Sequence, residues 1–349
     1  MDSEKTRVAV LGATGAVGQR FVQLLAGHPW FELAAVAASG RSEGRAYGEV
    51  VRWLLPGSVP EEAAALALVA AEPAAVDADL VFSALDPAAA ESVEGRFRAA
   101  GKTVVSNASA YRMHPDVPLV VPEVNPGHLA MISGQRARCG GAIVTNPNCS
   151  TIGLCLALEP LRKAFGLRRV QVTTMQALSG AGYPGVPSMD VVDNVLPLIP
   201  GEEDKLEREP AKIFGTLSGS EVEAHPVALS AQCNRVAVRD GHLLSVSVEM
   251  EKRATLEEAA EAIEGYRSPL EGLALPSAPE RPVLLNRSAA RPQPVLDRDA
   301  CRGMSATVGR LKPCPVLGLR FVALVHNTLR GAAGNTILIA ELMKARNLL

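Results

Sequence analysis

RVAVLGATGAVGQRFVQLLA, residues 7–26, is the stretch that decides the fold of this 349-residue chain. An apolar run leads into a turn with Gly12, Gly15 and Gly18, and a helical pattern follows over 16–26. In a dinucleotide-binding turn, such glycines permit a tight turn, a close approach to the pyrophosphate and close strand–helix packing. The helix N-terminus then faces the negative charge. The GxxGxxG spacing in this context predicts a nucleotide site, and a simple left-handed glycine turn is the alternative.

The end of the second predicted strand indicates which dinucleotide is expected. That strand covers 33–38 and is followed by Ser39, Arg41 and Ser42. NAD sites usually place an Asp or Glu here to bond the ribose 2′-hydroxyl. A hydroxyl and a guanidinium suit a 2′-phosphate instead, so we expect NADP as the cofactor. Arg41 as a solvated loop charge is the alternative, and Glu43 keeps dual specificity open.

Alternating strands and helices continue to residue 145 and predict a parallel, doubly wound α/β sheet of the Rossmann type. The Ala-rich stretch 60–72 favours a helix, and so does 87–100. Further strands are expected at 79–84, 102–106, 119–121 and 142–146.

The second half of the chain has a different pattern and predicts a second, α+β domain. Longer alternating segments, typical of a mixed or antiparallel sheet, lie at 168–178, 226–238 and 242–252. The turn at 239–241 predicts a hairpin between the last two. Residues 179–220 hold no long periodic segment, and such a stretch is usually functional or a subunit contact. A helix is expected over 331–349.

Length and composition fit a two-domain globular protein. The chain is 48% hydrophobic and 21% charged, and 35 Lys and Arg against 37 Asp and Glu give a net charge of −2. This balance gives no reason to expect a nucleic acid as partner. No apolar run is long enough for a membrane span, and no apolar leader precedes the first strand. Six cysteines without a CxxC pair argue against disulfides and zinc, so we expect free thiols, no metal and a cytoplasmic location.

Cys149 is the candidate nucleophile because it lies between the strand-like run at 142–146 and a helical run. A helix N-terminus or a nearby cation lowers the pKa of a thiol and generates the reactive thiolate. A buried, inert cysteine is the alternative, and it is the better interpretation for Cys155 inside the apolar helix.

His242 is the candidate acid/base because it follows the polar turn at 239–241 and starts a strand. Arg235 lies before that turn. Across a hairpin, both side chains could point to one site from adjacent strands. Without that context, His242 would be an ordinary satisfied histidine.

Eight motifs in order resemble aspartate-semialdehyde dehydrogenases, nearer the archaeal and fungal branch than the common bacterial one. The resemblance spans nearly the whole chain. The motifs are VAVLGATGAVGQRFVQLL (8–25), SNASAYRM (106–113), VPEVN (121–125), NPNCST (146–151), QALSGAGYPG (176–185), GEEDK (201–205), CNRVAVRDGH (233–242) and HNTLRGAAGN (326–335).

The resemblance implies a reversible, phosphate-dependent reduction of L-aspartyl 4-phosphate by NADPH to L-aspartate 4-semialdehyde, in lysine, threonine and methionine biosynthesis. By match of motif, Cys149 would form a thioester. His242 would activate the thiol and protonate the hemithioacetal, and Gln176 would position the reacting carbonyl.

The resemblance also assigns the groups that bind the substrate. Arg235 would bind the α-carboxylate in a forked contact. Glu202 would meet the substrate amine and Lys205 the phosphate, with Arg112 and Asn148 completing the phosphate site. For Glu202 and Lys205, a solvated face of a charged helix is the alternative.

A discontinuous domain organisation follows from the resemblance, because the family's terminal helix returns to the nucleotide domain. We expect an NADP-binding domain at 1–148 and 330–349, a catalytic and dimerisation domain at 149–329, and a homodimer or homotetramer. The expected cofactor-contacting residues are Gly12, Thr14, Gly15, Ala16, Val17, Ser39, Arg41, Ser42, Ser83, Gly180 and Asn327.

Other functions remain open on the sequence. Malonyl- or succinyl-CoA reductases resemble the same branch and also use a cysteine thioester and NADPH, but they need no phosphate. N-acetylglutamyl-phosphate reductase carries a different cysteine motif. An inactive NADP-binding regulatory protein would be expected to lose Cys149, His242, Gln176 or Arg235, and all four are present.

Overall fold

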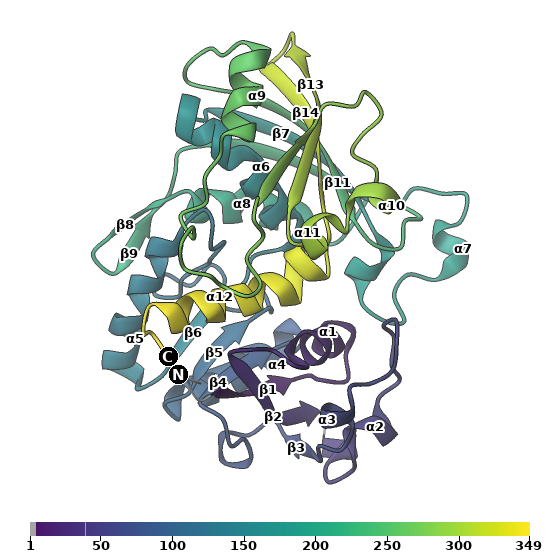
Figure 1. Cartoon of the computed structure of the whole chain (residues 1–349), viewed down its shortest axis with the longest axis vertical. Coiled ribbons are helices and arrows are strands. Elements are labelled where there is room, and N and C mark those ends of the chain that lie inside the picture. The colour runs from purple at the N-terminus through teal and green to yellow at the C-terminus, as the bar shows by residue number, and fades with distance from the viewer. Residues whose placement is uncertain (1–4, 39) are drawn as a thin grey trace.

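The computed structural model describes residues 5–38 and 40–349, with the backbone alone described at position 41. Within these residues, two six-stranded sheets form the two halves of the molecule (Figure 1). None of the described helices is both long and apolar enough to cross a bilayer.

The first sheet is parallel throughout and has the strand order β3-β2-β1-β4-β5-β6. The order reverses between β1 and β4, and ligands of doubly wound folds bind at such a switch point. The glycine turn follows β1 at this position. The strands are β1 Thr6–Leu11, β2 Phe31–Ala38, β3 Leu68–Ala70, β4 Leu80–Ser83, β5 Thr103–Ser106 and β6 Ala142–Thr145.

Helices cover both faces of the first sheet, as its apolar strands require. One face packs against α1 (Ala16–Leu25), α5 (Met131–Cys139) and the C-terminal α12 (Gly334–Ala345). The other face packs against α4 (Pro87–Ala99) through Phe97. Because α12 buries Ile337, Leu338 and Met343 in this core, the end of the chain returns to the sheet formed by its beginning.

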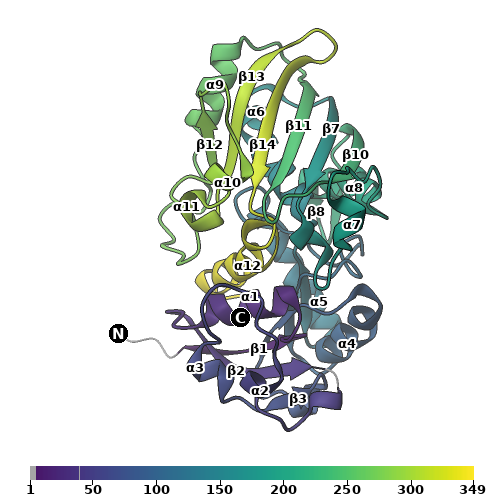
Figure 2. The ribbon, with the colours of Figure 1, turned by 90° about the vertical axis from the view of Figure 1, so that its right-hand side faces the viewer.

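The second sheet is mixed and has the order β10-β7-β11-β14-β13-β12. Its covered face packs on α6 (Cys149–Phe165), α8 (Glu202–Ile213) and α9 (Leu256–Glu264). Figure 2 shows the opposite face without helices over it. The strands are β7 Arg169–Gln176, β10 Ala228–Arg235, β11 His242–Glu249, β12 Val283–Asn286, β13 Ala306–Cys314 and β14 Gly318–Val325. The shorter elements are α2 Tyr47–Val50, α3 Glu61–Ala64, α7 Ser188–Val191, α10 Pro294–Asp297, α11 Ala300–Gly303, β8 Thr216–Ser218 and β9 Glu221–Glu223.

The predicted hairpin between 226–238 and 242–252 is wrong. β7 lies between the two strands and pairs with β10 in parallel and with β11 antiparallel. In this register Arg235 is opposite Gln176, and Leu243 is opposite Met175. Arg235 at the end of β10 and His242 at the start of β11 therefore lie at the same edge of the sheet. Gln176, at the end of β7, lies between them.

Three other local predictions are also wrong. Residues 60–72 form the short helix α3 and then the strand β3. Residues 68–70 are a strand because they pair in parallel with β2 at the edge of the first sheet. The stretch 119–121 makes only an isolated bridge, between Leu119 and Thr145. The stretch 179–220 contains α8, whose regular pattern was hidden because its buried face carries charges as well as Leu206 and Ile213.

Two glycines inside helices predict opposite responses to alanine. An ideal Cβ on Gly18 of α1 would lie 2.1 Å from the carbonyl oxygen of Gly12, whereas one on Gly134 of α5 would meet only the end of the Arg138 side chain, at 3.3 Å. We expect Gly18→Ala to lower the free energy of unfolding by about 1–3 kcal/mol, because it overpacks the glycine turn. Gly134→Ala, the matched control, should leave it unchanged or raise it by up to about 1 kcal/mol. Urea unfolding measures both, and equal stability of the two variants would contradict the packing of this turn.

Candidate active site

Cys149 begins α6 directly after the buried end of β6. Asn148 is the N-cap of this helix, and its Oδ1 accepts hydrogen bonds from the backbone N–H groups of Ser150 and Thr151, at 2.9 and 3.3 Å. The partly exposed Cys149 lines a cavity of about 320 Å³. The strand–helix junction predicted from the sequence therefore places the thiol at the wall of a pocket.

His242 contacts this thiol from the first position of β11. Its Nε2 lies 3.1 Å from Sγ of Cys149, and its Nδ1 accepts a hydrogen bond from the backbone N–H of Ala177 at 3.0 Å. Burial lowers the pKa of His242 to about 3, so the imidazole is neutral. Since Nδ1 is the acceptor, the single ring proton belongs on Nε2, facing sulfur.

Burial outweighs the lowering of the Cys149 pKa that the backbone N–H of Ser150 supplies at the helix N-terminus. Desolvation by the surrounding protein raises the pKa of the thiol to about 12, and the carboxylate of Glu202 adds to this. Arg112 and Arg235 act in the opposite direction but do not compensate. The resting group is a thiol because burial outweighs the cations.

Glu202 on α8 accepts hydrogen bonds from three of the predicted site residues. Its Oε2 accepts from the side-chain amides of Asn148 at 2.8 Å and Gln176 at 3.3 Å, and its Oε1 accepts from Nζ of Lys205 at 2.7 Å. Burial alone would raise the pKa of Glu202, but Lys205 and these hydrogen bonds lower it. Glu202 is thus a buried, ionised side chain rather than part of a solvated helix face.

Arg235 lies behind the cavity wall. Its Nη1 donates to the carbonyl oxygen of Ala177 at 2.8 Å, and an ideal Cβ on Gly180 would lie 2.9 Å from that Nη1 and 3.0 Å from Cε1 of His242. Glycine at position 180 thus lets the loop pass close over both side chains. Gly180 itself lines the cavity, as predicted for a ligand-contacting residue.

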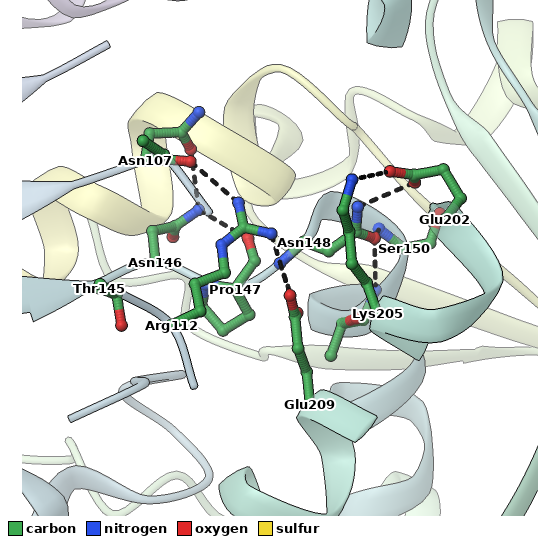
Figure 3. A network of polar contacts seen from close by, with 12 residues as sticks. Asn107, Arg112, Thr145, Asn146, Pro147, Asn148, Ser150, Glu202, Lys205 and Glu209 are labelled. Atoms are coloured by element: carbon green, nitrogen blue, oxygen red, sulfur yellow. Dashed lines mark hydrogen bonds and ion pairs between the residues drawn. The ribbon is translucent and has the colours of Figure 1, made fainter. Parts of the chain in front are cut away.

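Arg112 reaches the same cavity from the loop after β5 and is held by protein groups. Its Nη1 pairs with Glu209 at 3.0 Å and its Nη2 donates to the carbonyl of Asn107 at 2.9 Å (Figure 3). The other predicted residues on the cavity wall are Val17, Asn148, Cys149, Glu202, Lys205 and Asn327.

Asn327 also joins two site loops. Its Oδ1 accepts from the backbone N–H of Gly241 at 2.8 Å, and its Nδ2 donates to Oγ of Ser179 at 2.7 Å. The residues before His242 and before Gly180 are therefore tied together by one amide. The side chain of Ser83 is buried at the end of β4 and is not part of the cavity wall.

The glycine turn fits a dinucleotide pyrophosphate. Gly12 has φ +71°, and α1 begins after Gly15 without a side-chain cap, so the first amides of α1, including those of Ala16 and Val17, stay available to an anion. Tyr47 Oη donates to the carbonyl of Ala13 and Gln19 Nε2 to that of Thr14, both at 2.9 Å.

The residues expected to bind a 2′-phosphate are only partly described. Ser42 lies in the single turn Gly40–Ser42 that follows β2. Ser39 and the side chain of Arg41 lie outside the described residues. Within the described part of the chain, no group of three His, Cys, Asp or Glu side chains could hold a metal ion.

Sequence reasoning missed several residues that hold the site. Asn107 and Ser179 line the cavity and, like Gln19, lie within the quoted motifs, but the motifs assigned them no role. Tyr47, Glu209 and Lys212 are absent from both the cavity wall and the motifs. For those on α8, the signal was the helical spacing of charges at 202, 205, 209 and 212. The missed residues are Gln19, Tyr47, Asn107, Ser179, Glu209 and Lys212.

Comparisons with known proteins match nearly the whole chain. The family model "Semialdehyde dehydrogenase, NAD binding domain" matches residues 7–132, and "Semialdehyde dehydrogenase, dimerisation domain" matches 158–330. The chain is 53% identical to an aspartate-semialdehyde dehydrogenase of Archaeoglobus fulgidus, over 96% of this chain and 97% of the relative. It is 50% identical to that of Methanothermobacter thermautotrophicus, over 96% and 98%.

A solved structure has the same fold. The aspartate semialdehyde dehydrogenase of Candida albicans, solved with NADP, superposes with a TM-score of 0.92 at 40% identity, and the match covers 99% of this chain and 100% of that one.

The raised pKa of Cys149 predicts how the free enzyme reacts with a neutral alkylating agent. Only the thiolate reacts, and its fraction grows about tenfold per pH unit below the pKa. We expect the rate of carbamidomethylation of Cys149 by iodoacetamide to climb without a plateau between about pH 6 and pH 9. Mass spectrometry of the Cys149 peptide separates this reaction from that of the other cysteines. A plateau near neutral pH would show that the helix N-terminus outweighs burial.

Proposed function

The chain belongs to the aspartate-semialdehyde dehydrogenase family, and on that premise we propose that it interconverts L-aspartyl 4-phosphate and L-aspartate 4-semialdehyde through a Cys149 thioester, with NADP as cofactor and phosphate as product or co-substrate. Family membership makes it an oxidoreductase of amino-acid biosynthesis. The observation that carries the proposal is the 3.1 Å contact between Nε2 of His242 and Sγ of Cys149 at the cavity wall.

In the reductive direction, Sγ of Cys149 attacks the acyl carbon, the bond from carbon to the phosphate oxygen breaks, and the thioester forms. The thiol proton leaves with the departing phosphate. NADPH, when bound, would supply the hydride that reduces the thioester carbon. His242 delivers the proton on its Nε2 to the former carbonyl oxygen, giving a hemithioacetal, and takes up a replacement proton from solvent. In the collapse of this adduct the C–S bond breaks and the hydroxyl proton passes to sulfur, which releases the semialdehyde and restores the thiol.

The neutral state of both reacting groups suits the buried site. In the oxidative direction, addition of the thiol to the aldehyde transfers a proton from sulfur to the carbonyl oxygen. A relay through Nε2 of His242 achieves this without leaving a net charge at the site, and the Ala177 N–H on Nδ1 keeps the ring in the required orientation.

The charged groups around the cavity match a substrate with an anion at each end. We propose that Arg235 binds the α-carboxylate, Glu202 the amine, and Arg112 with Lys205 and Asn148 the phosphate. Gln176 would position the reacting carbonyl, since its amide already donates toward Glu202. Guanidinium groups match carboxylate and phosphate geometry, whereas a lysine acts as a point charge.

We propose that the NADP-binding domain comprises 1–148 and 330–349, and that the catalytic and dimerisation domain comprises 149–329. The packing of α12 on the first sheet supports this division. Within the first domain, Gly12, Thr14, Gly15, Ala16 and Val17 would hold the pyrophosphate. Ser39, Arg41 and Ser42 would bind the 2′-phosphate, and Ser83, Gly180 and Asn327 complete the proposed cofactor site.

A second copy of the chain is the proposed partner. Figure 2 shows the face of the second sheet opposite α6, α8 and α9 without a covering helix. Partly or fully exposed side chains of its strands include Ser245, Ser247 and Arg320. This face belongs to the region matched by the dimerisation model, so we propose that it is the surface of a homodimer. All six cysteines are free, and we propose a reducing, cytoplasmic location.

The proposed reaction predicts that NADP reduction by aspartate semialdehyde requires inorganic phosphate. We expect Cys149→Ala to retain less than about one hundredth of the activity, since the thioester cannot form. Absorbance at the NADPH band measures the rate with and without phosphate, and NADP titration confirms that the variant still binds cofactor. Phosphate-independent turnover of malonyl-CoA or succinyl-CoA would instead identify an acyl-CoA reductase.

The two arginines should give different kinetic signatures. Arg235→Lys keeps the charge but loses the fork, so we expect kcat/KM for the semialdehyde to fall roughly tenfold. Arg112→Ala should raise the KM for phosphate. Initial rates with each substrate varied in turn distinguish the two effects. If both variants impair phosphate use alone, Arg235 does not bind the carboxylate.

A further inference from the structure

Helix α8 presents a row of alternating charges to the catalytic machinery. Glu202, Lys205, Glu209 and Lys212 follow at spacings of three, four and three residues, which places them on one face of the helix. The first two belong to the substrate site proposed above. Glu209 and Lys212 lie farther along the helix, are buried, and are absent from the cavity wall.

Glu209 connects two parts of the site that come from different segments. One carboxylate oxygen accepts from Nη1 of Arg112 at 3.0 Å, and the other accepts from the backbone N–H of Asn148 at 2.7 Å (Figure 3). Only 2% of Glu209 is exposed. Because Asn148 caps the helix that Cys149 begins, this one carboxylate links the guanidinium to the nucleophile's helix.

We propose that Glu209 is a positioning residue that fixes Arg112 relative to the N-terminus of the Cys149 helix, and that it thereby sets the enzyme's use of phosphate. The inference rests on the proposed function, in which Arg112 binds phosphate. Glu209 touches neither substrate nor cofactor in this assignment and acts through Arg112.

The remaining contacts of Arg112 support a positioning role. Its Nη2 donates to the carbonyl of Asn107, while its buried Nε has no hydrogen-bond partner among the described residues. Two donors thus fix the plane of the guanidinium and leave other donors for a ligand. Arginine binds phosphate through such a planar fork, so rotation of the plane costs hydrogen bonds even when the charge stays near.

Lys212 holds the backbone of the same loop. Its Nζ donates to the carbonyl oxygens of Arg112, His114 and Val117, at 2.8, 2.8 and 2.7 Å. Lys212 therefore binds the main chain of Arg112, and Glu209, about one turn earlier on α8, binds its side chain. The side chain and the main chain of Arg112 are thus both held by α8, which restrains the loop 107–117 relative to this helix.

The carboxylate of Glu209 beside Arg112 also reduces the positive potential at the phosphate subsite. This would weaken phosphate binding, whereas correct positioning of Arg112 would strengthen it. The two effects predict opposite results when reach and charge are changed separately. Glu209→Asp keeps the charge but is one methylene shorter, so it cannot span Arg112 and Asn148 together. Glu209→Gln keeps the length but loses the charge. Its one amide oxygen can replace only one of the two carboxylate oxygens, so the N–H₂ group faces either Arg112 or the N–H of Asn148, and both of these are donors.

The test measures the KM for inorganic phosphate in the oxidative assay with full-length Glu209→Asp and Glu209→Gln. If Glu209 positions Arg112, we expect both variants to raise this KM by about tenfold or more, with the KM for NADP changed less than about twofold. Glu207→Gln is the matched control, because Glu207 is also on α8 and accepts a backbone N–H, that of Ala231 at 3.0 Å, away from the cavity. It should behave as wild type.

A double-mutant cycle separates positioning from a general structural effect. Because Glu209 acts through Arg112, the effect of Glu209→Asp on the phosphate KM should be largely lost in an Arg112→Ala background. Urea unfolding checks that each variant folds. Should Glu209→Gln not fold, the charged Glu209→Asp variant and its cycle still decide the question.

Several outcomes overturn the inference. A wild-type phosphate KM in Glu209→Asp, with a lower KM in Glu209→Gln, would show that the carboxylate only neutralises Arg112. Additive effects in the cycle would show that Glu209 does not act through Arg112. If the wild-type enzyme needs no phosphate, the proposed function fails first. A phosphate-dependent enzyme with an unaffected Glu209→Asp variant contradicts the positioning role alone.

Discussion

The rest of the active site depends on the contact between Sγ of Cys149 and Nε2 of His242, which brings together residues 93 positions apart in the chain. Other residues position both side chains. The thiol is placed by the Asn148 cap at the start of α6, and the imidazole by the N–H of Ala177 at the end of β7. Both supports lie at ends of elements, where backbone groups are free to bond side chains. The two sheets therefore have to dock accurately before the Cys149 thiol and the His242 imidazole meet.

Burying so many charges around this contact is possible because each has a partner. An unpaired buried charge costs several kcal/mol, of roughly the size of a domain's whole stability. Glu202 is paired with Lys205 and Glu209 with Arg112, while Arg330 is fully buried against Glu123. Most of these pairs use α8 as one member. That helix is thus both part of the pocket and the support on which the neighbouring loop rests.

The charged pairs also explain why the second half of the chain was harder to predict than the first. The first sheet is buried on both faces, so its strands are short apolar runs separated by helices, and its order follows from the doubly wound pattern. In α8, buried charges occupy positions that are apolar in most core-facing helices, so the hydrophobic periodicity of the sequence did not predict this helix. The turn at 239–241 links two strands that are not neighbours in the sheet. The sequence pattern did not predict this, because alternation along a strand shows which face is buried but not which strand pairs with it. Within the 60–72 stretch, residues 68–70 form an edge strand because they pair with β2, which overrides the helix preference of alanine there.

By itself the sequence determined the glycine turn between β1 and α1, the place of Cys149 at the start of a helix and the family to which the chain belongs, because these are local patterns or ordered motifs. Only the tertiary structure decided the ionisation of the site. A helix N-terminus alone lowers the pKa of a thiol, but burial and Glu202 raise that of Cys149 to about 12. It also decided that Gln176 lies between Arg235 and His242, and that Glu209 joins Arg112 to the helix that begins at Cys149. Desolvation and pairing depend on what surrounds a group in three dimensions, and that is set by how distant segments pack.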